Sequence, residues 1–389
     1  MRPIHSVPLT ALSLLSFLTA SAMMPRDASS QQHVPIAAPR DRTADSLRAV
    51  IDAGAPRWLA EFHVPSLAVA YVRDGAVAWT RVYGEQAPGV PATGRTLYNV
   101  ASLSKPVFAE TMLRLAAARR LSLDEPMAPT WIDPDLAGDP RARTLTPRMA
   151  LSHQIGFANW RRETDGVLRF KWEPGTGFHY SGEGFEYARH FAVVRTGAQL
   201  DSLAREHVFR RFGMSETSFA PQPWFAGRVA QPMGPEGRYG TPSSSPSGNA
   251  ADDLHTTIGD YAAFLVGVMK HDGLPARLVA QRDSLHVIDD GEGSRCDPAK
   301  VSRCPTRIGY ALGWSVMEYP EGPVLWHTGA DWGEKTMVFY FPARREGVVM
   351  FTNGANGFAP MVEAGVVLAG GTPFADYLAS GREEVKPKS

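Results

Sequence analysis

The sequence predicts an α/β (α+β) fold in which an antiparallel sheet, built from both chain ends and flanked by terminal helices, carries an inserted, mostly helical lobe. Strand-like apolar runs gather near both ends of the chain, at 66–73, 76–83, 310–317, 323–327, 336–341 and 347–352. Between these two groups the sequence consists of helical patterns and of loops rich in proline and glycine. Two groups of strands separated by helices are most economically joined into one sheet.

The N-terminal elements are expected in the order helix, strand, tight turn, strand. Apolar residues at helical spacing predict a helix over 45–62, although Gly54 and Pro56 allow a kink or two separate pieces. Asp74-Gly75 lies between two apolar runs and predicts a hairpin, because both turn positions favour a positive φ.

Helices and loops are expected to fill the middle of the chain. One helix begins at Ser102 and runs to about Arg120, with Pro106 in its first turn, where the missing N–H costs little. Thr257 is expected to cap another helix that runs to about Met269. The remaining expected segments are a loop at 84–95 and helices at 147–151, 183–195, 199–209 and 359–369.

The expected domain organisation is one domain over 44–380. Its sheet lobe would comprise about 44–101 and 306–375, and its helical lobe about 102–305. Residues 23–43, which are polar and contain several prolines and glutamines, are expected to be a linker, and 381–389 a tail.

Residues 1–22 have the pattern of a signal peptide. Arg2 precedes an apolar run at 7–18, and Ala20-Ser21-Ala22 has the small-residue pattern of a cleavage site. The apolar run is short for a membrane-spanning helix, and an uncleaved anchor is the alternative. The chain is therefore expected to be exported, periplasmic or secreted, with no membrane span after signal removal.

The composition argues against a nucleic-acid partner. The 389 residues include 40 Lys+Arg and 40 Asp+Glu, a net charge of +0, so no basic field is present. The two cysteines, Cys296 and Cys304, are expected to form a disulfide that closes a short loop in an exported protein, with two free thiols as the alternative.

Ser102 and Lys105 form the first candidate site. Residues three apart share one face of a helix, so the hydroxyl and the amine are expected side by side at a helix start. The chain has seven lysines, and only Lys105 has a serine three positions before it. A buried lysine can lose its proton and act as a base, which arginine cannot. The pair indicates an activated serine nucleophile, although by itself it is also compatible with a solvated surface helix.

Two further stretches accompany this pair: Tyr180-Ser181-Gly182 before a predicted helix, and His327-Thr328-Gly329 at the end of a predicted strand. Together with Ser102-Leu103-Ser104-Lys105 they resemble, in order, the Ser-x-x-Lys, Tyr-x-Asn and Lys-Thr-Gly or His-x-Gly motifs of the serine β-lactamase and penicillin-binding protein superfamily. The resemblance covers about 44–370. It is nearest to the class C-like branch of β-lactamase-related serine hydrolases, D-Ala-D-Ala carboxypeptidases, D-aminopeptidases and β-lactamase-fold esterases. It implies a β-lactamase/transpeptidase-like fold.

The resemblance also implies an acyl-enzyme mechanism. Ser102 would attack an amide or ester carbonyl, and either Lys105 or Tyr180 would first take its proton. The oxyanion hole would be formed by the backbone N–H groups of Ser102 and Ala330. His327, Thr328 and Gly329 would bind the substrate, a small molecule or a peptide that could derive from the cell wall. No metal or organic cofactor is required.

Two departures from the family motifs bear on the substrate. Gly182 stands where the family has an asparagine that helps hold the substrate amide. His327 stands where a lysine would supply a fixed positive charge, and histidine is charged only near or below neutral pH. Lys335 could replace that charge if its side chain pointed into the cleft. The changes favour a D-amino-acid peptidase, a carboxypeptidase-like enzyme or an esterase over an efficient β-lactamase.

Other assignments remain open or are disfavoured. A β-lactamase of low efficiency and a non-catalytic penicillin-binding-like protein are the alternatives. An α/β-hydrolase is disfavoured because the chain has no Gly-x-Ser-x-Gly, and a zinc hydrolase because it has no His-Glu-x-x-His. His153 is expected to be a structural hydrogen-bonding residue, and Trp160 either to wall a pocket or to cap the core.

Overall fold

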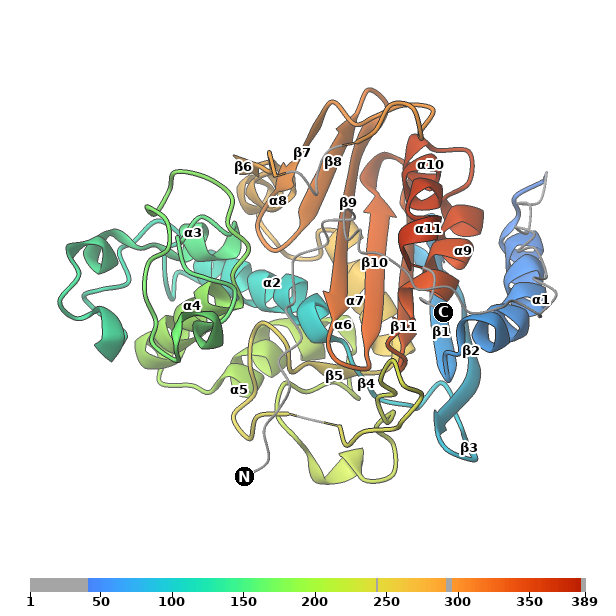
Figure 1. Ribbon diagram of the computed structural model, residues 1–389. Helices are drawn as coiled ribbons and strands as arrows, with labels where there is room; N and C mark the ends of the chain where they lie inside the picture. The colour runs from blue at the N-terminus through green and yellow to red at the C-terminus, as the bar shows by residue number, and fades with distance from the viewer. Residues whose placement is uncertain (1–40, 243, 292–295, 386–389) are drawn as a thin grey trace, which may run out of the picture.

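The computed structural model describes residues 41–242, 244–291 and 296–385. It shows a large antiparallel sheet covered by helices on both faces and joined to a group of helices and loops beside it (Figure 1). The fold class predicted from the sequence is confirmed. The expected signal peptide and all but the last three residues of the expected linker lie outside the described residues.

The strands of the large sheet come from both ends of the chain. Their order is β3-β2-β1-β11-β10-β9-β8-β7-β6, and all neighbouring pairs are antiparallel. The first and last parts of the chain meet where β1 pairs with β11. The strands are β1 (Ser66–Arg73), β2 (Ala76–Ala87), β3 (Val90–Pro91), β6 (Val287–Ile288), β7 (Arg307–Tyr310), β8 (Ser315–Tyr319), β9 (Gly322–Ala330), β10 (Lys335–Phe341) and β11 (Glu346–Thr352).

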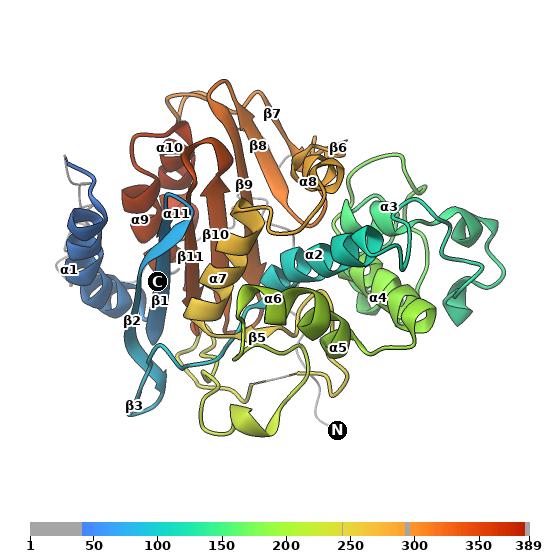
Figure 2. The same cartoon turned by 180° about the vertical axis from the view of Figure 1, so that it is seen from behind.

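The sheet is buried on both faces. In β1, alternate residues enter opposite hydrophobic clusters, Leu67 and Val69 on one side and Ala68 and Ala70 on the other, as the two-residue period of a strand requires. The helices α1 (Ala44–Phe62), α9 (Phe358–Ala369) and α10 (Pro373–Ser380) belong to the first cluster. The second cluster includes α7 (Ile258–Met269), which crosses the opposite face (Figure 2).

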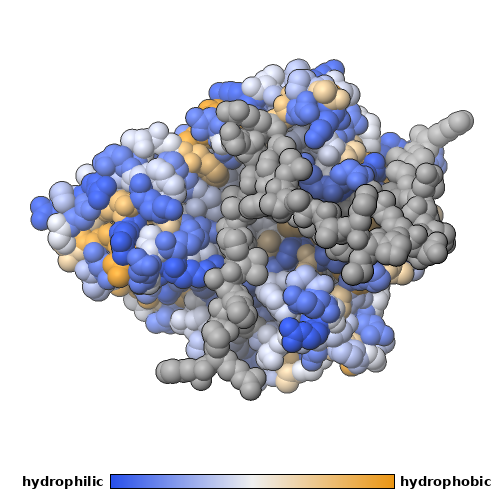
Figure 3. Space-filling view, viewed as in Figure 1, coloured by the Kyte–Doolittle hydropathy of each residue, from blue (hydrophilic) through white to orange (hydrophobic). Residues whose placement is uncertain are grey.

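The helical part lies beside this second face. The long helix α2 (Ser104–Ala117) is buried along most of its length, and Glu110 within it pairs with Arg114 at 2.8 Å and with Arg282 at 3.4 Å. The surface of the helical part, at the left of Figure 3, is mostly hydrophilic, with some apolar residues exposed. The other helices of this part are α3 (Pro147–Leu151), α4 (Gly182–Thr196), α5 (Leu200–Ala204), α6 (Arg210–Phe212) and α8 (Ala276–Asp283). The short α11 (Arg382–Val385) instead packs against α9 and α10 on the first face.

Some expected element boundaries were confirmed and others were wrong. The helix expected over 45–62 is present as one helix with Pro56 inside it. The expected loop at 84–95 contains the end of β2 and all of β3. The expected strand at 310–317 is two strands, β7 and β8, joined by a turn in which Gly313 has a φ of +82°. Apolar residues continue through this turn, so the hydrophobic pattern did not mark it.

Two further observations concern the chain as a whole. Cys296 and Cys304 form a disulfide, as expected. Of the helices in the described ranges, none has the length and apolar character needed to cross a membrane.

Candidate active site

Ser102 lies at the junction between a short strand and a long helix. The strand β4 (Tyr98–Asn99) pairs with β5 (His255–Thr256), and the 3-10 turn η1 (Ala101–Leu103) then leads into α2. Ala101 has a φ of +47°, which is unusual for a residue with a side chain, and its N–H donates to the Asn99 side-chain oxygen at 2.7 Å. Strained backbone of this kind is characteristic of functional sites.

Lys105 is buried directly behind Ser102. Its side chain is 0% exposed, and Nζ donates to Ser102 Oγ at 3.0 Å and to the Ala251 carbonyl oxygen at 3.0 Å. Among the described residues, no ion pair between Lys105 and a carboxylate is found. The predicted contact between the serine and the lysine is therefore present, and the lysine is held by neutral groups.

Tyr180 faces Lys105 from the segment that precedes α4. Lys105 Nζ lies 4.8 Å from the centre of the Tyr180 ring. His153 holds this segment on both sides of the tyrosine: its carbonyl accepts from His179 N at 2.8 Å, and its Nδ1 accepts from Ser181 N at 3.0 Å. The His153 ring also packs against the Tyr180 ring, with 4.2 Å between the ring centres.

The end of β9 brings His327, Thr328, Gly329 and Ala330 beside Ser102. Gly329 permits the approach, because a Cβ at this position would lie 2.5 Å from the Val100 carbonyl oxygen and 3.0 Å from Ser102 N. The strand backbone and the Ser102 amide are thus closer than any side chain at 329 would allow.

His327 is a neutral hydrogen-bonding residue in this environment. It is 3% exposed, and its Nε2 and Nδ1 lie 2.7 Å from Tyr310 Oη and from the Thr328 carbonyl oxygen. Burial, followed by the positive charge of Lys105, lowers the pKa of His327 to about 3. The position therefore supplies no positive charge at neutral pH.

These groups surround a cavity of about 220 Å³. Ser102, Tyr180, His327, Thr328 and Ala330 line it, whereas Lys105 and Gly329 lie behind its wall. The other lining residues are Asn159, Trp160, Arg162, Phe178, Asp252, Asp289, Ile308, Gly309, Tyr310, Ser315, Met317, Trp326, Asp331 and Tyr377.

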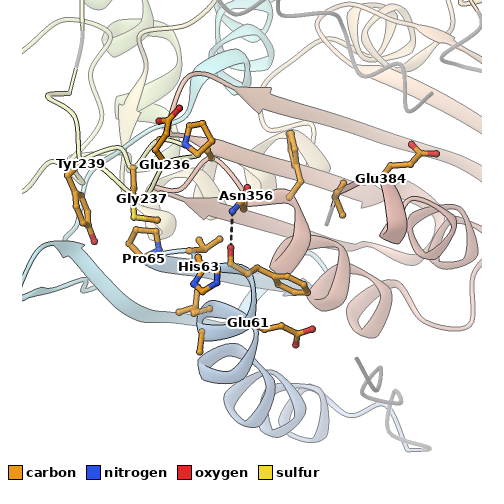
Figure 4. Close-up of a pocket in the computed structure, with 18 residues that line it drawn as sticks. Glu61, His63, Pro65, Glu236, Gly237, Tyr239, Asn356 and Glu384 are labelled. Atoms are coloured by element: carbon orange, nitrogen blue, oxygen red, sulfur yellow. Dashed lines mark hydrogen bonds between the residues drawn. The ribbon is translucent and has the colours of Figure 1, made fainter. Parts of the chain in front are cut away.

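A larger cavity of the described structure lies elsewhere. It measures about 1220 Å³ and is lined by the end of α1, the segment 233–239 and the start of α9 (Figure 4). Asn356 donates to the Phe62 carbonyl oxygen at 3.1 Å within it. Neither Ser102 nor Lys105 lines this cavity, so size alone does not identify the reactive site.

The structure explains why position 182 has no side chain, and it corrects the suggestion that Lys335 replaces a missing positive charge. A Cβ at Gly182 would lie 2.7–2.9 Å from the Trp160 ring, so this tryptophan fills the space that a side chain at 182 would need. Lys335 does not line the reactive cavity, since its Nζ donates to the carbonyl oxygens of Asp331 at 2.6 Å and Glu334 at 3.2 Å. It does not replace the charge that is missing at His327.

Sequence reasoning missed two residues at this site and recognised a third only in part. Tyr310 and Asp252 carried no motif, and they reach the cavity only because distant segments fold together. His153 was recognised as a hydrogen-bonding residue, but its contact with Tyr180 depends on tertiary structure.

The family follows from comparison with known sequences. The family model for Beta-lactamase matches residues 45–370. The chain belongs to the beta-lactamase family. The matched range contains the three motifs on which the resemblance was based, and it spans the sheet and the inserted helices alike.

Curated relatives of this beta-lactamase family member carry several different names. Penicillin-binding protein 4 from Amycolatopsis lactamdurans is 26% identical over 326 residues, 76% of this chain and 82% of that protein. Esterase EstB from Burkholderia gladioli is 28% identical over 303 residues, 74% and 68% of the two chains. A D-aminopeptidase from Gluconobacter oxydans (strain 621H) is 27% identical over 196 residues, 46% and 37% of the two chains.

Solved structures share the fold at low sequence identity. D-alanine carboxypeptidase AmpC from Burkholderia cenocepacia has a TM-score of 0.67 at 20% identity and covers 88% of this chain and 99% of its own. A class C beta-lactamase has a TM-score of 0.68 at 16% identity, covering 90% and 98%. At these identities the likeness establishes the fold and leaves the substrate to be argued from the site.

Proposed function

We propose that this protein is a serine hydrolase that cleaves an ester or amide through an acyl-enzyme on Ser102. The observation that carries the proposal is the 3.0 Å contact between Lys105 Nζ and Ser102 Oγ beside the cavity. A nucleophile within hydrogen-bond reach of a base is the arrangement that covalent catalysis needs.

Each step is assigned to a residue of the site. Lys105 takes the proton of Ser102 as Oγ attacks the carbonyl carbon. Tyr180, close to Lys105, gives a proton to the leaving group and later helps water attack the acyl ester. The backbone N–H groups of Ser102 and Ala330 receive the oxyanion, an interaction whose loss typically costs about 10²–10³ in rate.

The relatives support peptidase or esterase activity of this general kind. Among them are proteins named D-aminopeptidase and Esterase EstB. The neutral His327 and the indole over Gly182 alter the substrate contacts of the family, which disfavours efficient β-lactam hydrolysis.

Export is part of the proposal. The signal-like segment at 1–22 motivates it, and the Cys296–Cys304 disulfide supports it, because such bonds persist in oxidising compartments.

The test is steady-state and burst kinetics with p-nitrophenyl acetate and with the p-nitroanilides of D-alanine and L-alanine. Wild type should turn over at least one class, with an acyl-enzyme burst where deacylation is slow, and Ser102→Ala should lose that turnover by about 10³-fold or more. Equal turnover by wild type and Ser102→Ala would refute the assignment of the nucleophile.

A further inference from the structure

We propose that the cavity beside Ser102 accepts an uncharged, apolar acyl group and that Trp160 is the wall that limits its length. This inference rests on the proposed hydrolase function and specifies its substrate class. It is carried by the side chains of the cavity, by the balance of charges around it and by the position of the indole.

One part of the cavity wall is apolar. Trp160, Phe178, Ile308, Met317 and Trp326 line the space of about 220 Å³ together with tyrosine rings. Apolar surface of this kind binds aliphatic or aromatic groups by removing them from water. The volume is below the roughly 300–1,000 Å³ of clefts that hold drug-sized ligands, so a short acyl group suits it.

Acidic residues also line the cavity. Asp252, Asp289 and Asp331 all line it, from three separate segments of the chain. Burial, and then the nearby charge of Asp331, raises the pKa of Asp252 well above its usual value, so a negative charge at this position is costly. A substrate carboxylate placed beside it would meet the same cost.

The basic side chains near the cavity either have hydrogen-bond partners already or are exposed to solvent. Lys105 Nζ contacts Ser102 and the Ala251 carbonyl. Lys335 does not line the cavity, and its Nζ donates to the backbone carbonyls of Asp331 and Glu334. Arg162 lines the cavity but is exposed, 5.3 Å from the centre of the Trp160 ring, where water and salt screen its charge. The interior therefore offers no fixed cation for a carboxylate beyond the catalytic lysine.

Trp160 is held rigidly against the start of α4. The Asn159 side-chain oxygen accepts from Gly182 N at 2.9 Å, and the Asn159 carbonyl accepts from Glu183 N at 3.0 Å. On the other side, Arg161 N donates to Glu183 Oε1 at 3.0 Å. Hydrogen bonds thus fix both sequence neighbours of Trp160, and only a glycine at 182 leaves room for the Trp160 ring.

A second cavity lies on the other side of this indole. It measures about 780 Å³ and shares Trp160, Arg162 and Asp252 with the reactive cavity. The indole, together with Arg162 and Asp252, therefore forms the boundary between the two spaces. Removing it should join them and admit longer acyl chains.

The test measures kcat/KM for p-nitrophenyl esters from acetate to octanoate, and for p-nitrophenyl pentanoate against p-nitrophenyl hydrogen glutarate, which adds a terminal carboxylate. Wild type should prefer pentanoate over the charged ester by about tenfold or more, since an unpaired charge is costly in this site. Trp160→Ala should raise the octanoate-to-acetate ratio by about tenfold or more, and Trp160→Phe should raise it less.

Trp172→Ala is the matched control, because Trp172 is exposed, stacks on His179 and does not line the cavity. It should leave the chain-length ratio unchanged. The inference is overturned if wild type hydrolyses the charged ester as well as pentanoate, or if folded Trp160→Ala and Trp160→Phe, checked by thermal unfolding, both keep the wild-type ratio. Absence of any ester turnover and of any covalent labelling by a fluorophosphonate would instead refute the proposed function itself.

Discussion

At the scale of single residues, the environment of the reactive pair differs from that of an ordinary surface lysine. Lys105 is fully buried and is held by one hydroxyl and one carbonyl. Tyr180 and Phe185 present their rings to its Nζ at 4.8 Å and 5.7 Å. Lys105 is therefore part of the core, and its contact with the half-buried Ser102 is in place before a substrate arrives.

His153 is predicted to position Tyr180. It is buried, it has a φ of +57°, and its Nδ1 accepts the Ser181 N–H. Asparagine tolerates this backbone region and offers a side-chain acceptor, whereas leucine offers none. His153→Leu should lower kcat by about 10²-fold with little change in KM, the order of loss expected from a displacement of about 1 Å, and His153→Asn should recover part of it.

Steady-state kinetics and thermal unfolding of both variants check this prediction. Partial rescue of kcat by asparagine, at similar stability, is the signature of positioning. If the two variants lose stability equally and retain wild-type kcat, His153 has a purely structural role.

At the scale of elements, the close approach of β9 to η1 assembles the site. A methyl group at 329 would collide with Val100 O and with Thr336 Oγ1, and the latter cannot move freely because it donates to Val100 O at 2.8 Å. Gly329→Ala should therefore push β9 away from Ser102, destabilise the fold by about 1–3 kcal/mol and reduce turnover by about tenfold or more.

Gly94→Ala is the matched control, since a Cβ at that position meets no atom within 4 Å. Urea unfolding and ester kinetics on the two variants make the comparison. A Gly329→Ala protein with the stability and turnover of Gly94→Ala would show that the strand can shift without consequence.

At the scale of the whole molecule, stability depends on buried acids that are costly to ionise. Burial, and then the charge of Asp331, raises the pKa of Glu334 from 4.5 to about 7. Between these two values the folded protein keeps a proton that the unfolded chain has released, so Glu334 lowers stability as the pH rises. At about 1.4 kcal/mol per pH unit, the full effect is up to about 3 kcal/mol.

Glu334→Gln should remove this dependence, so the variant should gain stability relative to wild type as the pH rises from 5 to 7.5. Urea unfolding at several pH values measures the difference. Glu236→Gln, an exposed position, is the control and should stay parallel to wild type. A gap between Glu334→Gln and wild type that stays constant with pH would contradict the prediction.

Local sequence patterns predicted the elements better than their boundaries. The Asp74-Gly75 hairpin and the buried runs of β1, β10 and β11 were visible because periodicity and turn residues act locally. The division of 310–317 into two strands was missed, since Gly313 alone marks a turn inside an apolar run.

The sequence predicted only those residues of the candidate site that belong to recognisable motifs. The sequence indicated Ser102 and Lys105 because their contact lies within one turn of chain. The pairing of His327 with Tyr310 and the packing of Trp160 on Gly182 join segments 17 and 22 residues apart in sequence. Such contacts depend on the tertiary fold and have no local signature.

The most direct test of the central claim is intact-mass and peptide mapping after reaction with a fluorophosphonate. Wild type should gain one phosphonyl group on Ser102, and Ser102→Ala should gain none. Ser104→Ala removes the neighbouring buried serine, whose Oγ accepts from Leu254 N at 2.9 Å, and should label like wild type. Equal labelling of wild type and Ser102→Ala, or an adduct mapped to another residue, would contradict the account.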